Sequence, residues 1–151
     1  MRKYLVVIDE TDEARIALRF ASRRAAKTNG TLHILALVPK EDFVAWGAVQ
    51  ATMEDEAARR AEALVASAAG DYFSQSGQRP AISVKRGEGV ESLKKFLEEN
   101  DDITALVLGA AATGAPGPLV SYFAGSQAGS LPCPVMVIPG SLSNEEIDRL
   151  S

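Results

Sequence analysis

The residues best suited to chemistry in this 151-residue chain lie in a glycine- and proline-rich segment, Gly109–Ser121. It directly follows an apolar run, Ile103–Leu108, whose composition is typical of a buried strand. Glycine lets the backbone approach a ligand closely, and main-chain N–H groups after a strand can point at phosphate oxygens. With Pro118 in the first turn of a following helix, the next N–H groups are left for an anion. The pattern predicts a phosphate site formed by Gly109, Gly114, Gly117 and Ser121.

The segment brings no positive charge of its own. No Lys, Arg or His occurs between Lys95 and Arg149. A polyphosphate would therefore need a metal ion or cations from elsewhere in the chain, such as Lys40, Lys85 or Arg86. The alternative interpretation is a plain connection between strand and helix, although such connections usually take only about 2–6 residues.

Asp9 is the second candidate, because it ends an apolar run, Tyr4–Ile8, and precedes a helical pattern. It can cap that helix or contact a ligand, and the sequence leaves both readings open. The single His33 and the single Cys133 exclude a Cys/His metal cluster and an internal disulfide. No triad and no pair of carboxylates suited to acid–base work can be assembled, so we expect no catalytic residue and no metal site.

The elements that must position these residues alternate between strand and helix. Continuous apolar runs predict strands, and apolar residues spaced three and four apart predict helices. The expected strands are Tyr4–Ile8, Leu32–Val38, Ala81–Val84, Ala105–Leu108 and Val135–Ile138. The expected helices are Thr11–Asn29, Gln50 to Tyr72 or Phe73, Val90–Asn100, Leu119–Ser130 and a short capped one ending at Leu150. This order predicts an α/β fold, an open parallel sheet with helices on both faces.

Composition bounds the function further. A net charge of −4 disfavours nucleic acid, which needs a basic face. No apolar segment approaches the roughly 18 residues of a membrane span, and the N-terminal run is too short for a signal peptide. We therefore expect a cytoplasmic protein with a main domain over residues 1–140 and a C-terminal extension over residues 141–151.

Several of these pieces, in this order, resemble the universal stress protein family. They are a first strand ending in Val7-Ile8-Asp9, a second ending in Ala36-Leu37-Val38, then Val84-Lys85-Arg86-Gly87, Leu106-Val107-Leu108-Gly109, and a last strand preceded by Leu131-Pro132-Cys133-Pro134. The resemblance implies a Rossmann-like five-stranded sheet of order 3-2-1-4-5. It also implies a stress-response or signalling protein that binds ATP or AMP, with Mg²⁺ as an accompanying ion, and is at most a slow ATPase. In such members an acid at the position of Asp9 contacts adenine and the residue at Leu37 packs on the ring.

The chain departs from the family's nucleotide motif, G-x2-G-x9-G-S/T. Four residues separate Gly109 from Gly114, and the motif can end at Gly125-Ser126 or at Val120-Ser121. We favour the second register, because it leaves residues 122–131 for a helix. The family also implies a homodimer through Val135–Ile138, an apolar edge strand. The alternative function is a dimeric interaction module of the same fold that binds no nucleotide.

Overall fold

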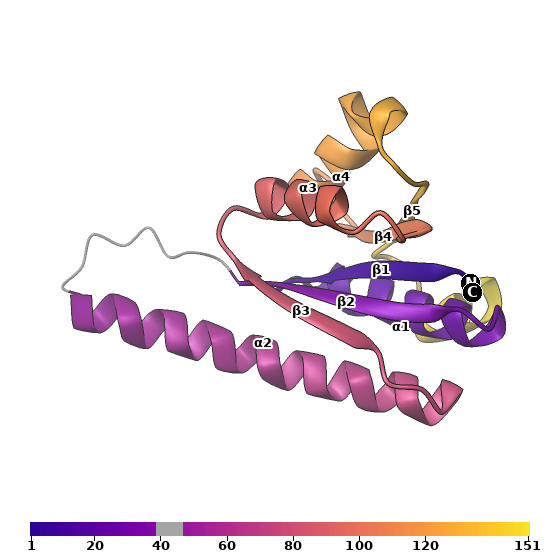
Figure 1. Cartoon of the computed structure of the whole chain (residues 1–151), viewed down its shortest axis with the longest axis horizontal. Coiled ribbons are helices and arrows are strands. Elements are labelled where there is room, and N and C mark those ends of the chain that lie inside the picture. Colours follow the sequence, from indigo (N-terminus) through magenta and orange to yellow (C-terminus); the bar gives the residue numbers. More distant parts are fainter. Residues whose placement is uncertain (39–46) are drawn as a thin grey trace.

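A computed structural model of the chain describes residues 1–38 and 47–151 (Figure 1). Strands and helices alternate along it, as the sequence predicts. The strands are β1 (Lys3–Ile8), β2 (Thr31–Val38), β3 (Ala81–Arg86), β4 (Ala105–Ala110) and β5 (Val135–Pro139). The helices are α1 (Asp12–Lys27), α2 (Gly47–Ser76), α3 (Gly89–Glu99), α4 (Pro118–Ser121) and α5 (Asn144–Leu150).

The five strands form one parallel sheet in the order β3-β2-β1-β4-β5, which confirms the predicted fold class and order. In the centre, Val6 lies opposite Ile34 of β2 and opposite Val107 of β4. The whole of Tyr4–Ile8 is buried because helices cover both faces of the sheet. Since β1 and β4 are parallel neighbours, the residues that follow them meet at the same edge, the carboxyl edge of the sheet.

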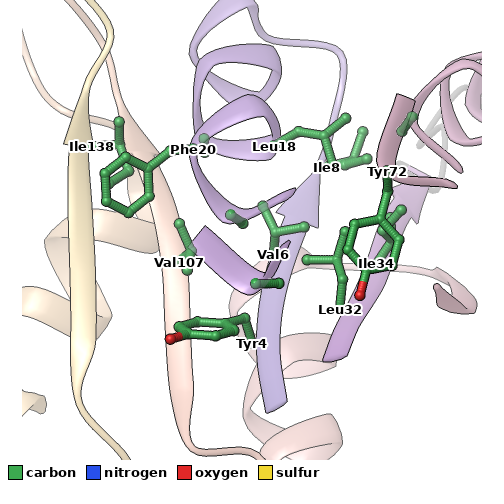
Figure 2. Packing of buried hydrophobic residues seen from close by; sticks show 14 of the residues in the cluster. Tyr4, Val6, Ile8, Leu18, Phe20, Leu32, Ile34, Tyr72, Val107 and Ile138 are labelled. Carbon is green, nitrogen blue, oxygen red and sulfur yellow. The ribbon is translucent and has the colours of Figure 1, made fainter. Parts of the chain in front are cut away.

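One face of the sheet packs against α1, α2 and α5. Figure 2 shows how helix side chains meet the strands there, with Phe20 of α1 beside Ile138 of β5 and Tyr72 of α2 against Ile34 of β2. Tyr72 is fully buried, and its hydroxyl donates to the Gly30 carbonyl oxygen at 3.3 Å. This layer fixes α1, and therefore the turn between β1 and α1 that carries Asp9.

The opposite face is covered by α3 and by the segment that begins with α4. Leu93 and Phe96 of α3, together with Phe123, pack on Leu5 and Leu35 of the sheet. The carboxylate at the helix start, Glu88, accepts hydrogen bonds from the N–H groups of residues 90 and 91, which stabilises the first turn of α3. The covering of this face holds the Gly109–Ser121 segment at the carboxyl edge.

α2 is longer at both ends than the sequence pattern predicts. It begins at Gly47 instead of near Gln50 and continues beyond Phe73 to Ser76. Gly77 ends it in the left-handed region, with φ of 72°, where glycine is favoured. Despite this length, no helix in the described part of the chain is apolar enough over a sufficient span to cross a membrane.

The continuous helix predicted over residues 119–130 is wrong. α4 passes into a π-helical turn, η1 (Tyr122–Ser126), and then into a short 3₁₀ turn, η2 (Ala128–Ser130). The chain bends at Gly125, whose φ of −101° and ψ of −123° are not helical. Glycine tolerates this geometry because it has no Cβ. The long helix that favoured ending the motif at Ser121 is therefore absent.

The C-terminal residues pack onto the sheet domain through α5. Ile147 is fully buried in the core beneath α1. Arg19 of α1 donates from Nε and Nη2 to the two oxygens of Asp148, at 2.8 and 2.7 Å, and this holds the pKa of Asp148 below its usual range. As the sequence predicts, a capping box between Ser143 and Glu146 begins the helix.

Candidate functional site

Asp9 lies directly after β1, at the carboxyl edge of the sheet, and is half-buried. Its Oδ1 accepts hydrogen bonds from the N–H of Thr11, at 3.0 Å, and from the Thr11 hydroxyl. This turn is the local reason for the side chain's orientation, because an aspartate readily bonds to the backbone two residues ahead. No partner from the described residues bonds to Oδ2, so this oxygen is left as an acceptor. The sequence pattern Asp-x-Thr was the available signal for the turn.

Two cavities meet at Asp9. The larger, of about 1120 Å³, extends from the carboxyl ends of β1 and β2 into the space between α1 and α2. Ile8, Leu37 and Val38 are among the apolar side chains that line it, and the far wall is α2 around Leu64. The structure thus brings Leu37 and Asp9 to one cavity, as expected for a pair that would contact a base. This gap between the helices carried no recognisable signal in the sequence.

The smaller cavity, of about 50 Å³, lies between Asp9 and the glycine-rich segment. Gly109, Gly117, Leu119 and Val120 line it. Pro118 is the first residue of α4, where its missing N–H is harmless. Two of the three predicted glycines therefore lie next to Asp9, as expected if the first and fourth strands are neighbours.

Gly109 has a structural reason to be glycine. A Cβ at this position would lie 2.2 Å from the main-chain oxygen of Glu13 in the first turn of α1. Gly140, after β5, is similarly confined, since a Cβ there would lie 2.5 Å from the Ala110 oxygen and 3.2 Å from the Glu13 Cβ. The beginning of α1 thus packs closely against the ends of β4 and β5, and this close packing alone requires Gly109.

Two residues of the predicted phosphate site, Gly114 and Ser121, lie outside both cavities. Gly114, with φ of 75°, is at the exposed tip of the segment, which folds back so that the N–H of Ala111 donates to the Pro116 oxygen at 3.1 Å. Ser121 is exposed, and its N–H donates to the Gly117 oxygen at 3.0 Å. That N–H is therefore used by the helix, which leaves those of Leu119 and Val120 as the candidate donors.

The charges around the site are mainly negative. Glu10 and Asp12 line the large cavity, and Glu13 lines the small one. Arg60 reaches the large cavity from α2 but pairs with Glu10, at 2.8 Å between Nε and Oε1. Arg15 and Arg19 of α1 also line it, and Arg19 pairs with Asp148. The sequence analysis did not connect these three arginines with the site.

The cations that the sequence did suggest are elsewhere. Lys85 and Arg86 end β3, and neither lines the two cavities. Lys40 lies outside the described residues. Within the part of the chain that the structure describes, no group of three or more His, Cys, Asp or Glu side chains is arranged to hold a metal ion.

Neither His33 nor Cys133 lines the two cavities at Asp9. The His33 Nε2 is 2.9 Å from the Ser83 hydroxyl, and its ring meets that of Phe96 edge to face at 5.1 Å. Burial, together with the charge of Lys3, lowers the pKa of His33. Burial also raises the pKa of the Cys133 thiol, which disfavours the reactive thiolate. Both fit structural roles.

Comparison with models of protein families gives a match to this chain. The model of the universal stress protein family matches residues 1–139, which is most of the chain. No curated protein matches the sequence at a significant level.

Solved structures repeat the fold. The chain is similar to a universal stress protein, UspA, from Lactobacillus plantarum, with a TM-score of 0.77 and 22% identity over 91% of this chain and 97% of that one. For a protein of the universal stress protein family from Burkholderia pseudomallei, the TM-score is 0.67 and the identity is 19%, over 91% of this chain and 95% of that one. For a universal stress protein in complex with cAMP, the TM-score is 0.59 and the identity is 17%, over 93% of this chain and 98% of that one. At these identities the likeness establishes the fold.

Proposed function

The chain belongs to the universal stress protein family, and we propose that it binds an adenine nucleotide at the carboxyl edge of the sheet, as a stress-response or signalling protein. The observation that carries this proposal is the position of Asp9, which lines both cavities and keeps its Oδ2 without a partner among the described residues. A carboxylate acceptor beside an apolar wall suits an adenine ring, which has an exocyclic amine and two flat faces.

In this proposal the base occupies the large cavity. Its amine donates to the Asp9 Oδ2, and Leu37 packs against the ring. The phosphate lies towards the small cavity, where the N–H groups of Leu119 and Val120 are the candidate donors and Gly117 allows a close approach. The known complex of a fold relative with cAMP supports a nucleotide of this class.

The charges favour a nucleotide with few phosphates. Five carboxylates line the two cavities, those of Asp9, Glu10, Asp12, Glu13 and Asp71, and the Gly109–Ser121 segment carries no cation. Each added phosphate increases the repulsion from these carboxylates. We therefore propose that AMP binds at least as tightly as ATP, and that ATP needs Mg²⁺ to offset its charge.

Calorimetric titration of the protein with AMP, ATP and inorganic phosphate, each with and without Mg²⁺, tests this function. The informative variant is Asp9→Asn, because Asn keeps an oxygen for the Thr11 turn but presents an NH₂ donor to the adenine amine. Loss of a charged hydrogen bond should weaken binding about tenfold or more. Asp101→Asn, at an exposed carboxylate remote from both cavities, is the matched control. No heat with any nucleotide at millimolar concentration would contradict the proposal.

A dimeric interaction module without a nucleotide is the second candidate. Two observations favour it, the small volume beside the glycine segment and the packing role of Gly109. For either function we propose a homodimer through β5, which among the described strands pairs with β4 alone and has Val137 38% exposed. Val137→Lys should halve the mass measured by light scattering. A dimer that persists in this variant would argue against the β5 interface.

A further inference from the structure

A third cavity lies at the opposite edge of the sheet, where the strands begin. Its volume is about 210 Å³, and it is lined by Arg2, Tyr4, Arg24, Thr104, Ala105 and Met136. Strands rise about 3.3 Å per residue, so the five steps from Tyr4 to Asp9 place this cavity roughly 17 Å from the proposed nucleotide site. It is therefore a separate feature of the fold.

The two hydroxyl groups at this cavity are already bonded within the protein. The Tyr4 hydroxyl is 3.1 Å from the Thr28 hydroxyl, which itself donates to the Arg24 oxygen. The Thr104 hydroxyl accepts from the Lys3 N–H at 2.8 Å and donates to the Lys3 oxygen at 3.0 Å. What remains for a ligand is the pair of guanidinium groups.

The two arginines are only partly used. Arg24 donates from Nη1 to the main-chain oxygen of Ser151 at 3.2 Å, while its buried Nε has no hydrogen-bond partner among the described residues. Because this Nε has no exposed surface, a ligand in the cavity would have to meet the terminal nitrogens of the guanidinium. The Arg2 side chain is exposed and has no partner in the described part of the chain.

The surrounding charges also favour an anion. Among the residues that the structure describes, no carboxylate side chain lines the cavity. Two acids that bond to chain neighbours of the lining residues are already paired, Asp102 with Lys3 at 2.9 Å and Asp148 with Arg19 and Arg23. Arg24 and Arg2 thus face one concave space whose described lining carries no negative side chain.

We propose that this cavity binds a small oxyanion of the phosphate class through Arg2 and Arg24. The volume corresponds to several water molecules of about 30 Å³ each, which fits inorganic phosphate or a small phosphomonoester and excludes a nucleotide. Arginine suits this ligand because its planar fork of N–H donors matches two phosphate oxygens. The open mouth of the cavity gives the ligand access from solvent.

Titration of the full chain with inorganic phosphate, followed by its amide ¹H–¹⁵N resonances, tests the proposal. We expect saturable shifts at Gly30, Thr104 and Ala105, and none along Gly109–Gly117, where the nucleotide site is proposed. Potassium chloride at equal ionic strength should not reproduce them. Shifts confined to the glycine segment, or equal shifts with chloride, would overturn the oxyanion site while leaving the nucleotide proposal to its own test.

Two independent variants make the result specific. Arg24→Gln and Arg2→Gln should each weaken phosphate binding about ten- to a hundredfold, because each removes a charged donor. Arg2→Gln keeps the test decisive if Arg24→Gln does not fold, since the Arg2 side chain is exposed and forms no hydrogen bond or ion pair with the described residues. The matched control is Arg79→Gln, an exposed arginine just before β3 that does not line the cavity. Equal losses of phosphate affinity in all three variants would mean that the effect comes from the overall charge of the protein, and this would overturn the proposed site.

Discussion

Replacement of Gly109 by alanine separates the two explanations of the glycine-rich segment. The added Cβ would lie 2.2 Å from the Glu13 oxygen and 2.7 Å from its carbonyl carbon. Both atoms belong to the backbone of the first turn of α1, so no side-chain rotation can relieve the contact. Either α1 moves away from the sheet or the end of β4 is displaced.

The expected loss of stability follows from this geometry. Overpacking a core usually destabilises by about 1–3 kcal/mol, and a contact with rigid backbone belongs at the upper end. For a chain of this size each kcal/mol lowers the melting temperature by about 2–4 °C. We therefore expect Gly109→Ala to melt roughly 6–12 °C below the parent, in the absence of any ligand.

Gly114→Ala is the matched control. Gly114 also follows β4, but nothing lies within 4 Å of a Cβ built there, so alanine meets only the strain of a φ of 75°. That strain costs about 1–2 kcal/mol, which predicts a smaller fall. Thermal unfolding followed by circular dichroism, without ligand, measures both variants. If Gly109→Ala melts no lower than Gly114→Ala, the packing explanation is wrong and the ligand explanation gains.

Three further outcomes are expected from the same measurement. Ile147→Ala should lose about 2–4 kcal/mol, because this side chain is fully buried; a smaller loss would mean that α5 is not part of the core. Gly70→Ala should gain about 0.5–1 kcal/mol, as Gly70 is exposed within α2 and has free space around it, and destabilisation would contradict that helix. Because the folded pKa of His33 lies below its unfolded value, its contribution is present above about pH 6.5 and is lost as the pH falls towards the folded pKa. His33→Gln should therefore flatten the decline in stability below about pH 6.5, and an unchanged slope would exclude His33 as its source.

The sheet could be predicted from the sequence because its strands are buried on both faces. Runs such as Leu32–Val38 are continuously apolar, and this pattern is largely local. The expected strand order came from family resemblance, and the parallel pairing confirms it. The helix over residues 119–130 was predicted wrongly, because a single glycine, Gly125, breaks it where the backbone is exposed and packing does not enforce helical geometry.

The candidate site could be predicted from the sequence only in part. Asp9 and Gly109 line the same small cavity, since both follow neighbouring parallel strands. The sequence could not indicate that Ser121 would use its N–H within the helix start, or that Arg15 and Arg60 would line the adjoining cavity. Those facts depend on how α1, α2 and α4 are placed, and that placement is set by contacts between residues far apart in the chain.

The Gly109–Ser121 segment shows which properties the sequence determines and which the tertiary structure determines. The sequence by itself determined a parallel α/β sheet, a loop rich in glycine at its carboxyl edge, and the absence of a cation within that loop. Only the tertiary structure decided what each glycine does, since a Cβ is forbidden at Gly109 by α1 and meets open space at Gly114. The physical reason is that conformational preference is a local property of a residue, whereas exclusion by a neighbour arises only when distant segments pack together.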